Sequence, residues 1–362
     1  MSTMKPLFLI ALIGILGSAA AQCPHGCSDD PFYYDPCRPD PNCIEMYNMD
    51  YQLYGDFIWW QIAGSGNEFA RLGGSQNDPI LPANEQGCIV EPKCHFEPGF
   101  RIGMAFNPCG STWDLFGQYT YLYTNAFTEE IVKMGVAGLH PLIWTLAYDE
   151  TTDLNLAKGE WMTHFNVFDF GFRKIYCINN CYDFQPHIGI KATWQELDYD
   201  VTYQEIVTAT TTTQSVQRFH TDFQGVGLRG GFDAAWRFSH CFSMVGGMAL
   251  SAVYSELCST REDTFTDDIN FHTPNVDKNV NLKLEKCVLI PVFELTFGVR
   301  FNQHVCGCYD VYAFAGWETQ VWMDLNRNLY IQTANGGDNN ILFGPHGNIT
   351  YQGLTARVGI GF

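Results

Sequence analysis

The sequence ends in "LTARVGIGF" (residues 354–362), and this stretch decides the fold because two kinds of side chain alternate along it. Leu354, Ala356, Val358, Ile360 and Phe362 are apolar, whereas the residues between them are threonine, arginine and glycine. Successive side chains of a β-strand point to opposite faces. The stretch therefore predicts a strand with one apolar face and one small or polar face, and the apolar face must meet either a protein core or lipid.

Three longer stretches alternate in the same way: "HFEPGFRIGMAF" (95–106), "FQPHIGIKATWQ" (184–195) and "VLIPVFELTFGVRFN" (288–302). Strands of ordinary globular domains average five or six residues, whereas tilted strands that cross a bilayer need about 9–11. In each stretch the second face is polar, charged or glycine. A polar second face fits a water-filled barrel interior better than the core of a secreted β-sandwich, so the apolar face is expected to meet lipid.

The N-terminal sequence indicates where in the cell the chain is directed. Lys5 precedes an apolar run from Leu7 to Leu16 and then "GSAAAQ", which predicts a secretory signal peptide over 1–21 with cleavage after Ala21. Cleavage removes Lys5, so the net charge changes from −19 to −20. Such acidity argues against nucleic acid as a partner. No later stretch has 18 consecutive apolar residues, so membrane residence requires a closed barrel.

The predicted fold is all-β: an antiparallel transmembrane β-barrel of 10–12 strands with short periplasmic turns and long extracellular loops. Twelve strands would require a further hairpin in "GVAGLHPLIWTLAY" (135–148). Segment 22–50 is predicted to be a cysteine-rich periplasmic N-terminal segment, and 51–362 the barrel, with both termini periplasmic in a bacterial outer membrane. Ten strands are expected at 51–61, 95–106, 113–124, 160–176, 184–203, 219–238, 242–257, 284–302, 309–324 and 354–362. The long loops are expected at 125–159, 204–217, 258–283 and 327–349.

The tail "YQGLTARVGIGF", the stretches "GFRIGMAF" and "GFRKIY", and "GLRGGFDAAWRF" resemble the Legionella-type major outer membrane protein family, which also occurs in chlamydia-like bacteria. The resemblance extends over nearly all of 51–362. It implies a pore-forming outer-membrane protein in which Phe362 is the assembly signal read by the barrel-assembly machinery. It brings no catalytic motif.

Charged side chains on the non-lipid face form the candidate pore lining. Their equal spacing around the turns predicts cross-strand ion pairs of Arg173 with Asp183 and of Arg300 with Asp310. Such columns either filter solutes or only brace the wall. The full set is Arg101, Asp114, Arg173, Asp183, His187, Lys191, Arg229, Asp233, Arg237, Glu294, Arg300, Asp310, Glu318 and Arg357.

Fourteen cysteines in an oxidising compartment predict disulfides, some of them between molecules. Their connectivity does not follow from the sequence. The candidates are Cys23, Cys27, Cys37, Cys43, Cys88, Cys94, Cys177, Cys181, Cys306 and Cys308.

The sequence thus predicts a porin for passive diffusion of small hydrophilic solutes or ions. The alternative is a disulfide-cross-linked structural outer-membrane protein or adhesin. No enzyme or cofactor is expected, because no spacing unites a nucleophile, a base and an orienting acid. No metal site is expected either, because the nearest set of four ligands, Cys23, His25, Cys27 and Cys37, would compete with oxidation in this compartment. The expected partners are outer-membrane lipid, the barrel-assembly machinery, and other copies or envelope proteins held by disulfides.

Overall fold

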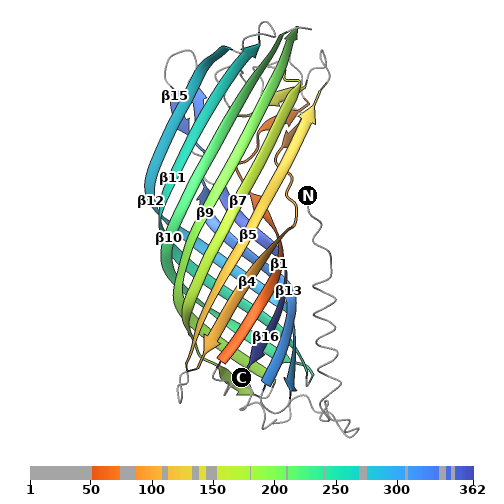
Figure 1. The fold of residues 1–362 in the computed structure, drawn as a ribbon, viewed down its shortest axis with the longest axis vertical. Helices are drawn as coiled ribbons and strands as arrows, with labels where there is room; N and C mark the ends of the chain where they lie inside the picture. Colours follow the sequence, from red (N-terminus) through yellow and green to blue (C-terminus); the bar gives the residue numbers. More distant parts are fainter. Residues whose placement is uncertain are drawn as a thin grey trace.

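The computed structural model describes residues 51–73, 87–107, 113–132, 138–143, 153–179, 181–208, 211–239, 241–268, 275–305, 309–333, 340–343 and 347–362. Within them, ten long antiparallel strands form one barrel with strongly tilted strands (Figure 1). These strands are β1 (Tyr51–Gly64), β4 (Glu97–Phe106), β5 (Asp114–Ile131), β7 (Leu156–Arg173), β9 (Tyr182–Thr208), β10 (Thr211–Arg237), β11 (Phe242–Asp268), β12 (Asn275–Val305), β13 (Tyr309–Asn326) and β16 (Gly347–Gly361).

The barrel closes where the two ends of the chain meet. β16 pairs with β1 from Gly361 opposite Gln52 to Ile349 opposite Gly64, and its other edge pairs with β13. The remaining neighbours follow one another in chain order, and β9 pairs with both β7 and β10. The predicted ten-strand barrel and its closure between 354–362 and 51–61 are therefore confirmed.

Two predictions about the connections are wrong. The described part of 135–148 contains only β6 (Leu139–Pro141), which pairs with β2 (Ala70–Leu72) rather than with the barrel wall, so the described residues of this stretch add no hairpin to the ten-strand barrel. The segments 204–217 and 258–283 are mostly strand, because β9 to β12 are 27 to 31 residues long. We call the end of the barrel near Phe106, Arg173, Arg237 and Val305 the short-turn end, and the opposite end the far end.

An outward-facing apolar zone surrounds the half of the barrel nearest the short turns. Aromatic rings mark both of its edges. At the short-turn end the ring of Tyr51 lies 5.0 Å from Phe106 and 5.7 Å from Phe362. Eight residues further along β1, or about 27 Å of strand, the ring of Trp59 lies 5.3 Å from Phe96. Two aromatic girdles at this separation fit a strand tilted across a bilayer.

Beyond this zone the same set of alternate residues still faces inward, but these inward residues are now apolar and the outward residues are polar. In "KATWQELDYDVTY" (191–203), Lys191 faces inward and Trp194 outward, whereas further on Tyr199 faces inward and Asp198 outward. The far half of the barrel therefore has the pattern of a water-soluble protein, with a polar exterior and an apolar core. Because of this reversal, the segments 204–217 and 258–283 have the composition of polar loops. The predicted strands therefore end short of the observed far ends of β9 to β12. No helix in the described residues is long and apolar enough to cross a membrane.

Short segments fill the far end of the barrel. There, β2 pairs with β3 (Cys88–Val90) on one edge and with β6 on the other. A second small sheet pairs β14 (Tyr330–Thr333) with β15 (Asn340–Phe343). At the short-turn end, by contrast, the four-residue β8 (Tyr176–Asn179) pairs with the start of β9. Phe69 is fully buried in the barrel core. The Phe69 ring occupies the space that a side chain at residue 159 would need, so a glycine at this position is required for the ring to pack there.

Candidate functional site

The charged residues predicted to line the interior all lie on the inner face of the barrel wall. Parity along each strand placed them there, because every second residue of a strand shares a face. Their burial ranges from complete, as for Lys191, to half-exposed, as for Asp233. The structure also adds inward acids that the sequence did not single out, Asp56 and Asp169, which turn out to be central acceptors.

The first ion network is centred on Asp56 of β1. Arg357 donates to both oxygens of Asp56, from Nε at 2.7 Å and from Nη2 at 2.9 Å. Arg101 donates to Asp56 at 3.1 Å and to Glu318 at 2.8 Å. The guanidinium of Arg357 also lies 4.1 Å from the ring centre of Tyr54, within cation–π range. Two arginines and two carboxylates balance one another in charge.

The second network joins β7, β9, β10 and β12. Lys191 Nζ lies 2.8 Å from Asp169 and 2.8 Å from Glu294, with its side chain fully buried. Arg229 donates to Glu294 at 2.8 Å and lies 3.7 Å from Asp169. This cluster also contains two cations and two anions. Buried charges are tolerated only when paired in this way.

Two further pairs lie nearer the short turns, but they are not the predicted ones. Arg173 contacts Asp114 at 3.2 Å, and Arg237 pairs with Asp183. The predicted Arg173–Asp183 pair is wrong because β8 lengthens the hairpin. Arg173 stands opposite His187, whereas Asp183 stands opposite Cys177.

The predicted Arg300–Asp310 pair is wrong for the same physical reason. β12 continues to Val305, so Asp310 lies opposite His304 and Arg300 lies opposite Phe314. Arg300 therefore faces the interior without an ion-pair partner among the described residues, and its Nε is buried without a hydrogen bond.

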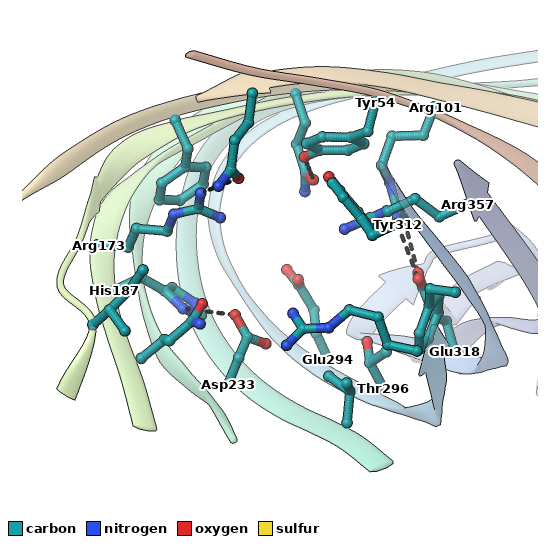
Figure 2. Close-up of a pocket in the computed structure, with 18 of the residues that line it drawn as sticks. Tyr54, Arg101, Arg173, His187, Asp233, Glu294, Thr296, Tyr312, Glu318 and Arg357 are labelled. Atoms are coloured by element: carbon teal, nitrogen blue, oxygen red, sulfur yellow. Dashed lines mark hydrogen bonds and ion pairs between the residues drawn. The ribbon is translucent and has the colours of Figure 1, made fainter. Parts of the chain in front are cut away.

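These groups surround a cavity of about 220 Å³ in the half of the barrel nearest the short turns (Figure 2). Gln52, Asn302 and Gly361, which are inward residues close to the strand ends, belong to its lining, so the cavity extends to the short-turn end. Arg101 and Glu318 of the first network and Glu294 of the second line it further inside. The cavity is polar and carries charges of both signs.

Towards the far end, the interior is closed by a layer of aromatic side chains. Phe165 lies 4.3 Å from Tyr351 and 5.9 Å from Trp322 between ring centres, and Phe223 lies 6.0 Å from Trp322. Trp60 is fully buried beside them. The sequence predicted a polar inner face along the whole barrel. The structure shows that this face is polar only in the half nearest the short turns. The reversal of polarity within each long strand was the signal that could have revealed this layer.

A loop segment around Asn67 lies inside the far end above this layer. Inward tyrosines hold them: Tyr199 donates to the carbonyl of Asn67 at 2.7 Å, and Tyr203 donates to the carbonyl of Phe69. From the other side, the Asn326 side-chain amide donates to Asn67 at 2.8 Å and to Ser65 at 2.8 Å. The segment around Asn67 is thus fixed inside the barrel by hydrogen bonds from opposite walls.

The cysteine predictions are resolved only in part. Cys88 and Cys94 are free thiols, so the prediction that they form disulfides is wrong. Cys181 is not a free thiol and is disulfide-bonded. Burial, together with nearby Glu91, raises the pKa of the Cys94 thiol to about 11, which keeps it protonated and unreactive. The side chain of Cys177 lies outside what is described, as do residues Cys23, Cys27, Cys37, Cys43, Cys306 and Cys308.

Comparison with known proteins identifies a family. The family model described as "Legionella pneumophila major outer membrane protein precursor" matches residues 46–354. No curated protein is significantly similar to the chain.

Among solved structures, the outer membrane protease OmpT of Escherichia coli shares 11% identity, covering 86% of this chain and 96% of that chain, with a TM-score of 0.37. A Pseudomonas aeruginosa FadL homologue shares 8%, covering 86% and 89%, with a TM-score of 0.25. The Pseudomonas putida toluene transporter TodX shares 7%, covering 89% and 92%, with a TM-score of 0.22. Scores this low carry no argument about activity.

Proposed function

The chain belongs to the family of the Legionella pneumophila major outer membrane protein, and from this premise we propose that it is a closed structural barrel of the outer membrane. In this proposal it acts without catalysis, its short-turn end faces the periplasm, and its far half projects from the cell surface as a rigid, polar-sided extension. Lipid surrounds the apolar zone, and the barrel-assembly machinery inserts the chain.

The observation that carries the proposal is the apolar inner face of the far half. These side chains belong to the wall strands themselves, including Trp60 of β1, Phe165 of β7 and Trp322 of β13. Burying one large apolar side chain is worth about 1.5–3 kcal/mol, so wetting Trp60, Phe165, Trp322 and Tyr351 costs on the order of 6–12 kcal/mol. A water column through this layer is therefore strongly unfavourable.

A general diffusion porin is the second candidate, and one observation favours it. The half of the interior nearest the short turns is polar, holds charges of both signs and contains a cavity of about 220 Å³. Such a lining suits hydrated solutes. Passage through the whole barrel would then require a rearrangement that moves both the segment around Asn67 and the aromatic layer.

Conductance separates the two candidates. We expect purified, refolded protein to give no stable conductance steps in planar bilayers and no solute leakage from liposomes. As a positive control, serine in place of Trp60, Phe165 and Trp322 should produce leakage when it is combined with Tyr199→Phe, Tyr203→Phe and Asn326→Ala, which release the segment around Asn67. Heat-modifiable electrophoretic mobility checks that this variant folds. Stable steps from the unmodified protein, with a selectivity that changes when Arg173, Arg237 and Arg300 are neutralised, would establish the porin instead.

The structural role has a test in cells. Deletion of the protein should make the outer membrane more sensitive to detergent while leaving the uptake of small hydrophilic solutes unchanged. Slower uptake with unchanged detergent resistance would contradict the structural role.

A further inference from the structure

The charges that face the cavity do not all cancel locally. The Asp56 network and the Lys191 network are each neutral, and the Arg173–Asp114 and Arg237–Asp183 pairs are neutral as well. Three charged residues of the described lining, Arg300, Asp233 and Asp310, lie outside these four groups. Asp310 is engaged by another residue, whereas Arg300 and Asp233 are not held in such a neutral group. They are the ions that remain available to a ligand.

Arg300 is the available cation. It lines the cavity, has no ion-pair partner among the described residues, and has a buried Nε without a hydrogen-bond acceptor. An unpaired guanidinium of this kind is an unusual feature in a wall where every other inward arginine described on β4, β7, β10 and β16 has a carboxylate partner. It binds planar carboxylates well, because its donors match the two oxygens.

Asp233 is the available anion. Its side chain is 47% exposed, and its ion-pair contact is with His187 Nδ1 at 3.6 Å. Figure 2 shows its carboxylate directed towards the centre of the cavity. The carboxylate lies over Gly247 in the space that a β-carbon would occupy, so this glycine sets its position.

The two groups lie on the same side of the barrel, on the two strands that flank β11. Asp233 of β10 is opposite Gly247 of β11, and Arg300 of β12 is opposite Ser243 of β11. Four residues along the strand and two strand spacings put their Cα atoms about 17 Å apart on the wall. Both side chains line the same cavity, so the long Arg300 side chain can cover part of this gap.

We propose that this cavity binds a small zwitterion, either a free amino acid or the end of a short peptide. The ligand carboxylate pairs with Arg300, and its ammonium group pairs with Asp233. The volume of about 220 Å³ is several times the ~30 Å³ share of one water molecule, so it accommodates a ligand of this size. Gln185, Asn302 and Tyr312 add neutral hydrogen-bonding groups to the same lining. The proposal does not depend on whether the barrel is closed or conducting, since the cavity reaches the short-turn end in either case.

Calorimetric titration of the refolded full-length barrel in detergent tests the proposal. We expect saturable binding of alanine or of alanyl-alanine, and the comparison of these two probes distinguishes a free amino acid from a peptide end. Arg300→Gln and Asp233→Asn should each weaken binding about ten-fold or more, the loss expected for one charge-assisted hydrogen bond. Lys283→Gln with Glu285→Gln removes one cation and one anion from an exposed outer pair, and this matched control should bind as the unmodified protein does.

Two blocked ligands and one further variant sharpen the result. N-acetylalanine lacks the ammonium group and alaninamide lacks the carboxylate, so both should bind at least about ten-fold more weakly than alanine. Gly247→Ala keeps every charge but displaces the Asp233 carboxylate, so it should weaken alanine and leave N-acetylalanine unaffected. Equal binding of alanine and N-acetylalanine would show a simple anion site and overturn the proposal. Absence of binding by both alanine and alanyl-alanine at about 10 mM would overturn it as well.

Discussion

At the scale of single residues, the interior is organised by acids that each serve two cations. Asp56 accepts from Arg101 and Arg357, and Glu294 accepts from Lys191 and Arg229. Sharing an acceptor fixes three strands at once, because the partners come from different parts of the wall. It also makes each central ion costly to remove, since its partners would remain buried and unpaired.

Lys191 gives the sharpest test of this arrangement. Lys191→Met leaves Asp169 and Glu294 with Arg229 alone, so we expect a loss of about 3–5 kcal/mol in the free energy of unfolding. Urea-induced unfolding in lipid vesicles measures it. Adding Asp169→Asn should restore part of the loss, because it removes the excess negative charge. The same change at the exposed Lys283 should have no measurable effect, and equal destabilisation by Lys283→Met and Lys191→Met would contradict the importance of burial.

His220 predicts a pH dependence in the far half, beyond the outward apolar zone. Its partial burial opposes the charged form, but the hydrogen bond to Asp198 at 2.6 Å and the proximity of Asp222 outweigh burial and raise its pKa. A raised pKa in the folded state stabilises the protein fully below the unfolded-state value of about 6.5. That stabilisation is lost as the pH rises through the folded-state pKa.

The expected outcome is a melting temperature that falls modestly from mildly acidic to mildly alkaline pH, and a smaller fall in His220→Asn. Thermal melts at several pH values measure the difference between the two proteins. The effect should be small, because the His220 side chain is 43% exposed. A difference that grows with rising pH would have the wrong sign for this cluster.

Individual inward positions could be predicted from the sequence, but their partners could not. Strand parity alone places Arg173, Asp183 and Arg300 on the inner face. Which of them meet depends on where each turn begins, and the extra residues of β8 and of the end of β12 shift the register. Asp56 is absent from the predicted lining although its parity along the first strand matches that of the inward residues.

At the scale of strands, the sequence predicted the short-turn ends well and the far ends poorly. The tail is the clearest success, since Leu354 and Ile360 face outward and Arg357 faces inward as the alternation required. The far ends were missed because a strand with a polar outer face and an apolar inner face resembles a polar loop with scattered aromatic residues. The phase of the alternation, rather than its polarity, carries through both halves.

The last strand supports a prediction about assembly. Phe362 exchanges two backbone hydrogen bonds with Tyr51 at 3.0 Å and stacks on its ring, at the edge of the outward apolar zone. A charge near the membrane interface costs only about 0–1 kcal/mol, so stability alone predicts a mild effect. We nevertheless expect Phe362→Asp to reduce the assembled protein severalfold, because the residue is proposed to be the recognition signal.

The amount of heat-modifiable barrel in outer-membrane fractions measures this outcome. Thr350→Asp is the matched control, since Thr350 lies on the same strand beyond the apolar zone and should assemble normally. If Phe362→Asp assembles normally, Phe362 is not the recognition signal for barrel assembly.

At the scale of the whole molecule, the barrel consists of two halves whose outer and inner faces have opposite polarity. One half has lipid outside and water or ions inside, and the other has water outside and an apolar core inside. The change occurs at the same level on several strands, near Trp59 on β1, Trp194 on β9 and Tyr254 on β11. A single closed sheet can pass from one environment to the other because every backbone group remains paired in both.

This arrangement leads to a prediction about orientation. The far half must stand clear of the membrane, and if the short turns face the periplasm, it stands on the cell surface. Cys258 and Cys287 are free thiols on the outer face of β11 and β12, just beyond Tyr254. Cys258 is opposite Glu285 and Cys287 is opposite Glu256, so the two are diagonal neighbours about 7–8 Å apart. That separation is too long for a disulfide between them without backbone movement.

Both thiols should therefore react with a membrane-impermeant maleimide on intact cells. The protein with Cys258→Ser and Cys287→Ser should lose that labelling, while Cys94→Ser should leave it unchanged, because the Cys94 thiol is partly buried and stays protonated. Mass spectrometry of the labelled peptides identifies the sites. If the two thiols are labelled only after the outer membrane is permeabilised, the barrel is inserted the other way. The far half would then be a periplasmic structure, and the proposed surface role would fail with it.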